Sequence, residues 1–288
     1  MKMSALGLGI LLASLWHSPA QVTVDIALDQ HQFLPGESLP AAVRITNRSG
    51  QTLHLGKDQQ WLVVSVESHD GNAVTKAGEL PVTGEFTLES SKRAIKTVDV
   101  APYFTLAKPG RYSVVATVTV PEWDRQITSQ SESFDIIDGV NMWEQEIGVP
   151  RPGGATNSPP EVRKYTLQQA NYLRRHLMLY LRLTDTTGKL NKVLAIGPMI
   201  SFGQPEPQVD RFSNLHVLYQ NGPHSFSYTI VDPDGNVLRR RSYDYTTRPR
   251  LEPDSNGNLV VTGGRRRLAA DDLPGAGTVD TNASISIP

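Results

Sequence analysis

The chemically most distinctive residues of this sequence are two runs of three arginines, Arg239-Arg-Arg241 and Arg265-Arg-Arg267. Alternate residues of a β-strand point to the same face, so Arg239 would lie beside Arg241, and Arg265 beside Arg267. If the two segments were neighbours, these four side chains would form a basic strip that could hold phosphate, sulfate or carboxylate groups. Charged residues that protect a sheet edge from aggregation explain the same runs equally simply.

Tryptophan offers a second kind of binding chemistry, because its flat ring can stack on a sugar. Trp123 stands in the segment Pro-Glu-Trp-Asp, where we expect a loop, and is the better exposed candidate. Trp61 precedes Leu62-Val-Val and is expected in a core. Packing in the core or at its rim is the competing interpretation of Trp123.

The segment Asp232-Pro-Asp-Gly-Asn236 has oxygen ligands at a spacing similar to that of a calcium loop. An EF-hand needs a further acidic or amide residue before its glycine and a glutamate at position twelve, and both are missing here. The related segment Asp185-Thr-Thr-Gly188 lacks the second carboxylate. The sequence therefore favours a hairpin turn at each segment, and a further one at Asp254-Ser-Asn-Gly-Asn258.

Signatures of metal binding and covalent catalysis are missing from the sequence. Its histidines after the leader include no pair at zinc-ligand spacing; they are His31, His54, His69, His176, His216 and His224. No nucleophile elbow, phosphate-binding loop or dinucleotide fingerprint occurs. A Ser, His and Asp site can still converge from distant loops without a local motif. We therefore predict a non-catalytic protein with no metal and no cofactor, and keep an enzyme as an alternative.

The N-terminal segment, residues 1–20, has the features of a secretory signal peptide. A basic start is followed by an apolar run from Ala5 to Trp16 and by the small-residue site Ser18-Pro-Ala20. We expect cleavage after Ala20 and a secreted or periplasmic protein. No later apolar run is long enough for a transmembrane segment. The sequence has no cysteine, so an exported chain of this composition would be stabilised by burial without disulfides.

The two halves of the sequence carry opposite net charge. Residues 21–138 hold 10 basic and 15 acidic residues, whereas residues 139–288 hold 17 basic and 14 acidic residues. An asymmetry of this size is far below the basic excess typical of proteins that bind nucleic acid. We therefore expect no nucleic-acid partner.

Short alternating segments separated by turn residues fill residues 21–138. We expect strands at 22–28, 41–46, 52–55, 61–67, near 86, and at 95–100, 112–120 and 132–137. Seven or eight short strands of this kind are typical of an Ig-like β-sandwich. The cysteine pair of antibody domains is missing, so an antibody-like domain is excluded.

Two segments of this half carry a more specific pattern. One runs from Leu106 to Ala116 and contains Pro109-Gly-Arg-Tyr112, and the other is Phe33-Leu-Pro-Gly-Glu37 followed by Val43-Arg-Ile-Thr-Asn47. Together they resemble bacterial Ig-like modules of the macroglobulin and proteinase-inhibitor type. The resemblance covers residues 22–137 and implies a fold alone, in which the hydroxyl of Tyr112 caps the end of a sheet.

The centre of the chain is expected to link two domains. Residues 139–165 include a Pro- and Gly-rich stretch and are predicted to form an extended linker. Thr166 then resembles a helix N-cap, and apolar residues at three-and-four spacing predict a short helix that reaches about His176. From Leu177 to Leu183 the period changes to two, which predicts a strand.

Residues 166–268 contain an internal repeat. The segment from Leu179 to Leu190 matches the segment from Phe226 to Val237 with an offset of 47, and residues 207–217 match residues 249–261. A period near 45 with these motifs resembles the blades of secreted β-propellers, which implies architecture alone. Residues 269–288 contain few large apolar groups and are expected to form a disordered tail.

The sequence thus predicts a mainly-β protein with an Ig-like β-sandwich and a blade-like antiparallel β repeat domain that includes one short helix. Its expected function is non-catalytic binding or scaffolding in the cell envelope, with a protein or an anionic polymer as partner. One alternative is a protease-inhibitor-like module that inserts the loop Leu80-Pro-Val-Thr-Gly84 into a protease cleft. Another is a glycan-acting hydrolase or lyase whose catalytic residues converge from loops.

Overall fold

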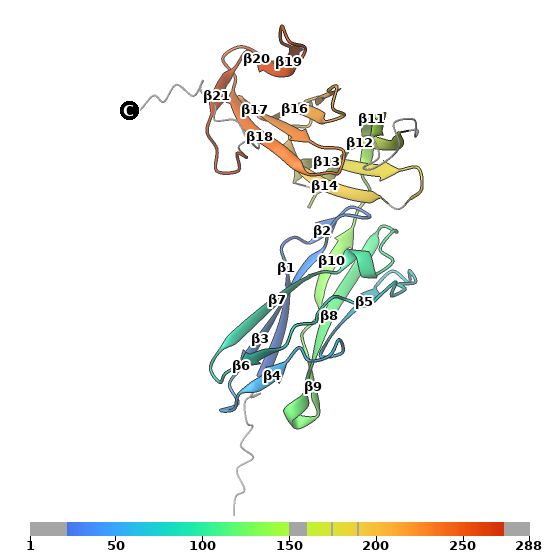
Figure 1. Cartoon of the computed structure of the whole chain (residues 1–288), viewed down its shortest axis with the longest axis vertical. Coiled ribbons are helices and arrows are strands. Elements are labelled where there is room, and N and C mark those ends of the chain that lie inside the picture. The colour runs from blue at the N-terminus through green and yellow to red at the C-terminus, as the bar shows by residue number, and fades with distance from the viewer. Residues whose placement is uncertain (1–21, 150–159, 174, 189, 274–288) are drawn as a thin grey trace, which may run out of the picture.

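The computed structural model describes residues 22–149, 160–173, 175–188 and 190–273. Strands account for 58% of the described residues and helical turns for 2%, so the predicted mainly-β class is confirmed. Figure 1 shows two β-rich halves arranged end to end, with the strands of the first half below those of the second. The expected signal peptide lies outside the described residues.

The N-terminal half consists of two main sheets and a small third one. The first sheet has the order β1-β3-β7, with β1 at Val22–Leu28, β3 at Pro40–Asn47 and β7 at Arg93–Asp99. The second has the order β2-β10-β8-β5, with β2 at Gln32–Phe33, β10 at Glu132–Ile136, β8 at Gly110–Val120 and β5 at Leu62–Ser68, and β9 at Arg125–Thr128 pairs with β8. A two-stranded sheet joins β4 at Leu53–Leu55 to β6 at Phe86–Leu88.

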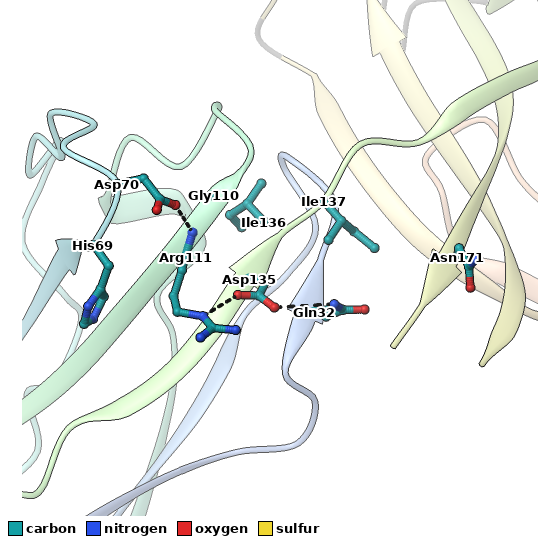
Figure 2. Close-up of a pocket in the computed structure, with 9 residues that line it drawn as sticks. All are labelled: Gln32, His69, Asp70, Gly110, Arg111, Asp135, Ile136, Ile137 and Asn171. Atoms are coloured by element: carbon teal, nitrogen blue, oxygen red, sulfur yellow. Dashed lines mark hydrogen bonds and ion pairs between the residues drawn. The ribbon is translucent and has the colours of Figure 1, made fainter. Parts of the chain in front are cut away.

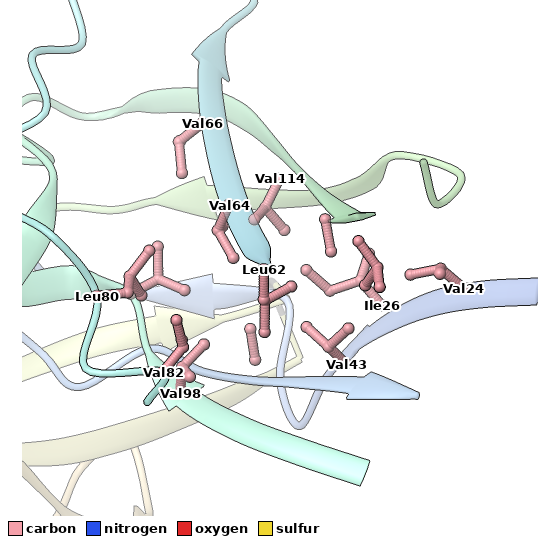
Figure 3. Close-up of a cluster of buried hydrophobic side chains, with 14 of the residues drawn as sticks. Val24, Ile26, Val43, Leu62, Val64, Val66, Leu80, Val82, Val98 and Val114 are labelled. Carbon is pink, nitrogen blue, oxygen red and sulfur yellow. The ribbon is translucent and has the colours of Figure 1, made fainter. Parts of the chain in front are cut away.

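Alternation of apolar and polar residues determines which faces of these sheets meet. Along β1 every second residue is buried, and β5 follows the same rule. The buried side chains from both main sheets form one apolar core (Figure 3). All eight strands predicted for this half are present, and β2 and β9 are additional. The additional strands were missed because strands of two and four residues give no periodic signal.

Tyr112 occupies the position that the sequence pattern predicted for it. Its ring is 1% exposed, stacks on Phe134, and its hydroxyl donates a hydrogen bond of 2.8 Å to the carbonyl oxygen of Lys108. The bond ties the start of β8 to the Pro-Gly turn before it. Trp61 is also buried, as expected, and its Nε1 donates to the carbonyl of Val82.

The chain passes to the C-terminal half through three residues only, Ile137 to Gly139. A Cβ on Gly139 would lie 2.8 Å from a methyl carbon of Leu34, so a larger residue here would have to displace the Leu34 side chain. The next four strands form a meander of order β11-β12-β13-β14. They are β11 at Val140–Val149, β12 at Glu161–Tyr172, β13 at His176–Asp185 and β14 at Asn191–Met199.

Two sequence-based predictions about this region are wrong. The predicted linker 139–165 contains all of β11 and the start of β12, and only residues 150–159 within it lie outside the described part. The predicted helix from Thr166 to about His176 is instead part of β12 and of the turn into β13. Leu167 and Ala170 pack into different apolar clusters on opposite faces of the sheet, so their three-residue spacing was not that of one helical face.

A second antiparallel sheet follows, with the order β15-β16-β17-β18-β21. Its strands are β15 at Glu206–Val209, β16 at Leu215–Gly222, β17 at Ser225–Val231, β18 at Val237–Asp244 and β21 at Arg265–Arg267. The hairpin of β19 at Arg250–Pro253 and β20 at Leu259–Thr262 forms a further layer. One apolar cluster joins the sheets β11-β14 and β15-β21, and another joins β15-β21 to the hairpin.

One type of turn recurs in the C-terminal half every 22 residues, at Asp210, Asp232 and Asp254. In each turn one carboxylate oxygen accepts the backbone N–H groups two and four residues later, and the other accepts the side-chain amide of an asparagine. The fourth residue has positive φ, at Ser213, Gly235 and Gly257. The hairpin-turn interpretation is confirmed at Asp232 and Asp254, and both turns lie in the second copy of the predicted repeat.

The predicted disordered tail begins too early. Residues 269–273 lie against the edge of β18, where Leu273 and Arg240 form a β-bridge with N···O distances of 3.0 and 3.4 Å. The carboxylate of Asp272 accepts hydrogen bonds from Arg266 at 2.7 Å and from the backbone of Ala269 at 3.0 Å. Residues 274–288 lie outside the described part.

The hydrogen bond of Tyr112 is expected to stabilise the N-terminal half. Tyr112→Phe removes the hydroxyl and leaves the Lys108 carbonyl without this donor, which should lower the free energy of unfolding by about 0.5–1.5 kcal/mol. Urea unfolding followed by fluorescence measures the loss. Tyr103→Phe is the matched control, because the half-buried Tyr103 packs on the same core and its hydroxyl makes no hydrogen bond to the described residues. Equal losses in the two variants would contradict the assigned role.

Candidate binding surfaces

The turn Phe33-Leu-Pro-Gly-Glu37 of the N-terminal half packs against the C-terminal half. Gly36 has φ +82°, and the buried carboxylate of Glu37 accepts the backbone N–H of Leu34 at 2.8 Å and the side-chain amide of Gln30 at 2.9 Å. Burial raises the pKa of Glu37 above its usual value, and these hydrogen bonds only partly oppose the shift. The turn is therefore held rigidly by its own carboxylate.

The outer face of the sheet β11-β14 receives this turn. Leu34 packs with Ala170, Tyr180 and Val193, and Glu37 forms a parallel β-bridge with Val193. Arg182 donates a hydrogen bond of 2.8 Å to the carbonyl of Pro35 and further bonds to Gln168 and Asn191. Burial lowers the pKa of Arg182. Apolar packing and directed polar contacts thus fix the two halves against each other.

An open cleft of about 650 Å³ lies beside this junction (Figure 2). The N-terminal half contributes most of its lining, and the C-terminal half contributes Asn171. The lining residues are Gln32, His69, Asp70, Gly110, Arg111, Asp135, Ile136, Ile137 and Asn171.

Arg111 is the central charged group of the cleft. Its side chain is 64% exposed, and its Nε donates to Asp135 at 3.1 Å, while its backbone N–H donates to Asp70 at 2.6 Å. Gln32 supports Asp135 from the other side, with an N···O distance of 3.4 Å. The terminal nitrogens of Arg111 make no hydrogen bond to the described residues, so they can donate to a ligand. The cleft thus presents the cationic donor Arg111 beside the anionic acceptors Asp70 and Asp135, and hydrogen bonds hold these groups in place. Sequence analysis did not predict it, because its residues come from five separate segments.

The predicted basic strip of Arg239, Arg241, Arg265 and Arg267 does not form. β18 and β21 are neighbours, but Ser242 lies opposite Arg267 and Asp244 lies opposite Arg265. Residues that lie opposite each other share a face, so Arg265 and Arg267 lie on the face of Arg240. Arg239 and Arg241 lie on the other face. Alternation within each run follows from the strand period, whereas the register between the runs is set by the pairing of β18 with β21.

The two other sequence candidates are partly or wholly covered. Trp123 is half-buried, packs against the N-terminal core and donates its Nε1–H to Gln51 at 3.3 Å. It occupies the rim of the core, which was the competing interpretation. In the loop from Leu80 to Gly84, the side chains of Leu80 and Val82 are 3% and 1% exposed. This loop therefore cannot place those side chains in a protease cleft without leaving the core.

The carboxylates that could have formed a calcium loop are used within the protein. Asp232 accepts three hydrogen bonds from its own turn. Asp234 pairs with Arg163 of β12 at 2.6 Å, which ties the turn to the neighbouring sheet. Among the described residues, no group of three His, Asp or Glu side chains is placed to hold a metal ion.

A buried chain of three polar side chains fastens the Asp210 turn to its sheet. His216 is 5% exposed; its Nδ1 lies 2.7 Å from the hydroxyl of Tyr228 and its Nε2 lies 3.2 Å from Asp210. Burial lowers the pKa of His216, and Asp210 only partly opposes the shift. Burial alone would raise the pKa of Asp210, but bonds from Asn214 and His216 outweigh it and lower that pKa. These three hydrogen-bonded side chains lie inside the fold, and their role is structural.

The buried histidine predicts a pH dependence of stability. Below the ordinary histidine pKa of 6.5 the unfolded chain takes up a proton at this position, whereas folded His216 stays neutral to a lower pH. The unfolded state then binds more protons, so stability falls as the pH falls, by at most about 1.4 kcal/mol per pH unit. His216→Gln should be less stable at pH 7.5 but should lose less stability between pH 7.5 and 5. Chemical unfolding at both pH values measures this difference, with the exposed His224→Gln as control. A loss as steep as that of the unmodified protein would contradict the assignment.

No protein-family model matches the chain, and no curated protein is significantly similar to it. The structure has a weak likeness to the crystal structure of Spo0M, a sporulation control protein from Bacillus subtilis. The two share 12% sequence identity over 70% of this chain and 80% of Spo0M, with a TM-score of 0.31. No described helix is long and apolar enough to cross a membrane.

Proposed function

We propose that the protein is an exported, non-catalytic binding or scaffolding module of the cell envelope, which contacts a protein or an anionic polymer. The observation that supports this function best is the open cleft beside the junction, with the exposed Arg111 at its centre. Polar groups on a rigid frame are typical of sites that recognise a partner through hydrogen bonds and charge.

The rigidity of the junction matters for this function. A partner that contacts both halves gains most when their relative orientation is fixed before binding, because less conformational entropy is lost. The hydrogen bonds of Glu37 and Arg182 fix this orientation before binding. Asn171 enters the cleft from the C-terminal half, so a ligand there would contact both halves.

We further infer that the N-terminal half is an Ig-like sandwich and that the C-terminal half is built from propeller-like blades. The hydrogen bond of Tyr112 supports the first inference. The second is supported by two successive antiparallel meanders, β11-β14 and β15-β18, each followed by the next layer of the stack. In this interpretation the hairpin β19-β20 corresponds to half of a third blade.

The two alternative functions have less support. An inhibitory role of the loop from Leu80 to Gly84 conflicts with the burial of Leu80 and Val82. A glycan hydrolase would need two available carboxylates. The cleft does contain Asp70 and Asp135, but both are already bonded to Arg111.

Export is the first testable part of the proposal. When the full sequence is expressed in a bacterial host, the protein recovered outside the cytoplasm should begin at Gln21. N-terminal sequencing or intact mass spectrometry measures this directly. A bulky residue at the cleavage site, Ala20→Phe, should leave the leader uncleaved. Recovery of the unprocessed chain in the cytoplasm would contradict export.

Binding through the cleft is the second testable part. Arg111→Ala and Asn171→Ala remove one polar group from each side of the cleft. Each should weaken binding to an immobilised envelope fraction about 5- to 30-fold, the effect of losing 1–2 kcal/mol at an interface. Biolayer interferometry measures the affinity. Arg125→Ala is the matched control, since Arg125 is exposed on β9 outside the cleft and the charge change is the same. Equal weakening by Arg111→Ala and Arg125→Ala, or turnover of an envelope glycan, would overturn the proposal.

A further inference from the structure

The register between β18 and β21 brings three arginines to one face of the sheet β15-β21. Arg240 lies two residues before Ser242 on β18, and Ser242 is the cross-strand partner of Arg267. Asp244, two residues further on, is the partner of Arg265. Arg240, Arg265 and Arg267 therefore point to the same side of two adjacent strands.

One carboxylate serves two of these arginines. Asp244 lies 3.4 Å from Nη2 of Arg265 and 3.3 Å from Nε of Arg267. The arginine side chains are 74% and 48% exposed, so both pairs are open to solvent. Two cations share one anion, and each guanidinium keeps donors that can serve a ligand.

Two buried polar groups lie on the same face as the three arginines. Thr229 is the direct cross-strand partner of Arg240 and is 0% exposed, yet its hydroxyl has no hydrogen-bond partner among the described residues. The Nε of Arg240 is buried as well and has no such partner. A buried hydroxyl and a buried guanidinium N–H are costly unless something accepts or donates a hydrogen bond to them.

The backbone around Arg240 is held in place. Its N–H and C=O both pair with Leu273, and Thr229 lies opposite it on β17. Ser242, next on the same face, is 4% exposed. The arrangement is fixed before any ligand arrives.

We propose that Arg240, Arg265 and Arg267 form a binding site for a phosphate group. Guanidinium groups bind phosphate through paired N–H donors, and three arginines lie here on one face of two adjacent strands. A phosphate monoester brings three oxygens and a charge of about −1.5 to −2, whereas a carboxylate has two oxygens and one charge. The site goes beyond the proposed function, because it lies on a different surface from the cleft of Arg111.

The test compares two arginines of the same strand on opposite faces. Titration of the folded full chain with inorganic phosphate, followed by calorimetry at constant ionic strength, should give saturable binding. Arg240→Ala should weaken it at least 10-fold and Arg267→Ala about 3- to 10-fold. Arg241→Ala makes the same charge change on the other face and should change affinity less than 2-fold. Similar weakening by Arg240→Ala and Arg241→Ala would overturn the site, as would the lack of saturable binding.

Two further measurements keep the test decisive. Thermal unfolding identifies any variant that fails to fold, and the exposed Arg267→Ala then carries the comparison because its side chain is not part of a core. Sulfate that binds as tightly as phosphate would overturn the assignment to phosphate. Soluble polyphosphate and vesicles that contain a phosphomonoester lipid distinguish a polymer from a lipid headgroup as the source. Arg240-dependent binding to either one supports the site.

Discussion

The structure depends on the burial of the sheet β11-β14 on both of its faces. On one face Leu179, Leu181 and Leu183 pack against the next sheet, and on the other Ala170, Tyr180 and Val193 receive Leu34 from the N-terminal half. Fully burying a side chain of the size of leucine contributes about 1.5–3 kcal/mol. This sheet is therefore the centre to which both halves attach. Asn171 of this sheet also lines the cleft of Arg111, which lies beside the contact between the halves.

Buried polar groups between the stacked sheets form hydrogen bonds with nearby groups, and these bonds keep the layers in register. Glu37 is bonded within its own turn, and Asp210 is bonded within its turn and to His216. Arg182 and Arg163 reach from the central sheet to backbone carbonyls of the layer on either side, at Pro35 and Pro233. Because a misplaced layer would leave these groups buried without partners, each of them restricts how the sheets slide.

The recurring aspartate turn explains how one simple unit builds the C-terminal half. The aspartate carboxylate closes a tight hairpin, and the residue at positive φ gives it the required twist. A hairpin of two strands cannot bury both of its faces alone, so successive hairpins join into sheets and the sheets stack. The two proposed binding surfaces are the cleft, which lies where this stack meets the N-terminal half, and the arginine face, which lies at the β18-β21 end of the second sheet.

Local patterns in the sequence determined much of this protein. Alternation of apolar and polar residues predicted the eight strands of the N-terminal half. The Pro-Gly-Arg-Tyr segment predicted the hydrogen bond of Tyr112, and the aspartate segments predicted the hairpin turns. Each of these features depends on residues that are neighbours along the chain. Burial of both faces of β12 was decided only by the tertiary structure, because layers distant in sequence cover it. Apolar residues therefore occur on both faces of this strand, and their spacing led to the wrong prediction of a helix. The same limit applies to the binding surfaces. Whether Arg267 lies beside Arg240 or Arg241 depends on a cross-strand register, and the lining of the cleft comes from segments that meet only in the folded chain.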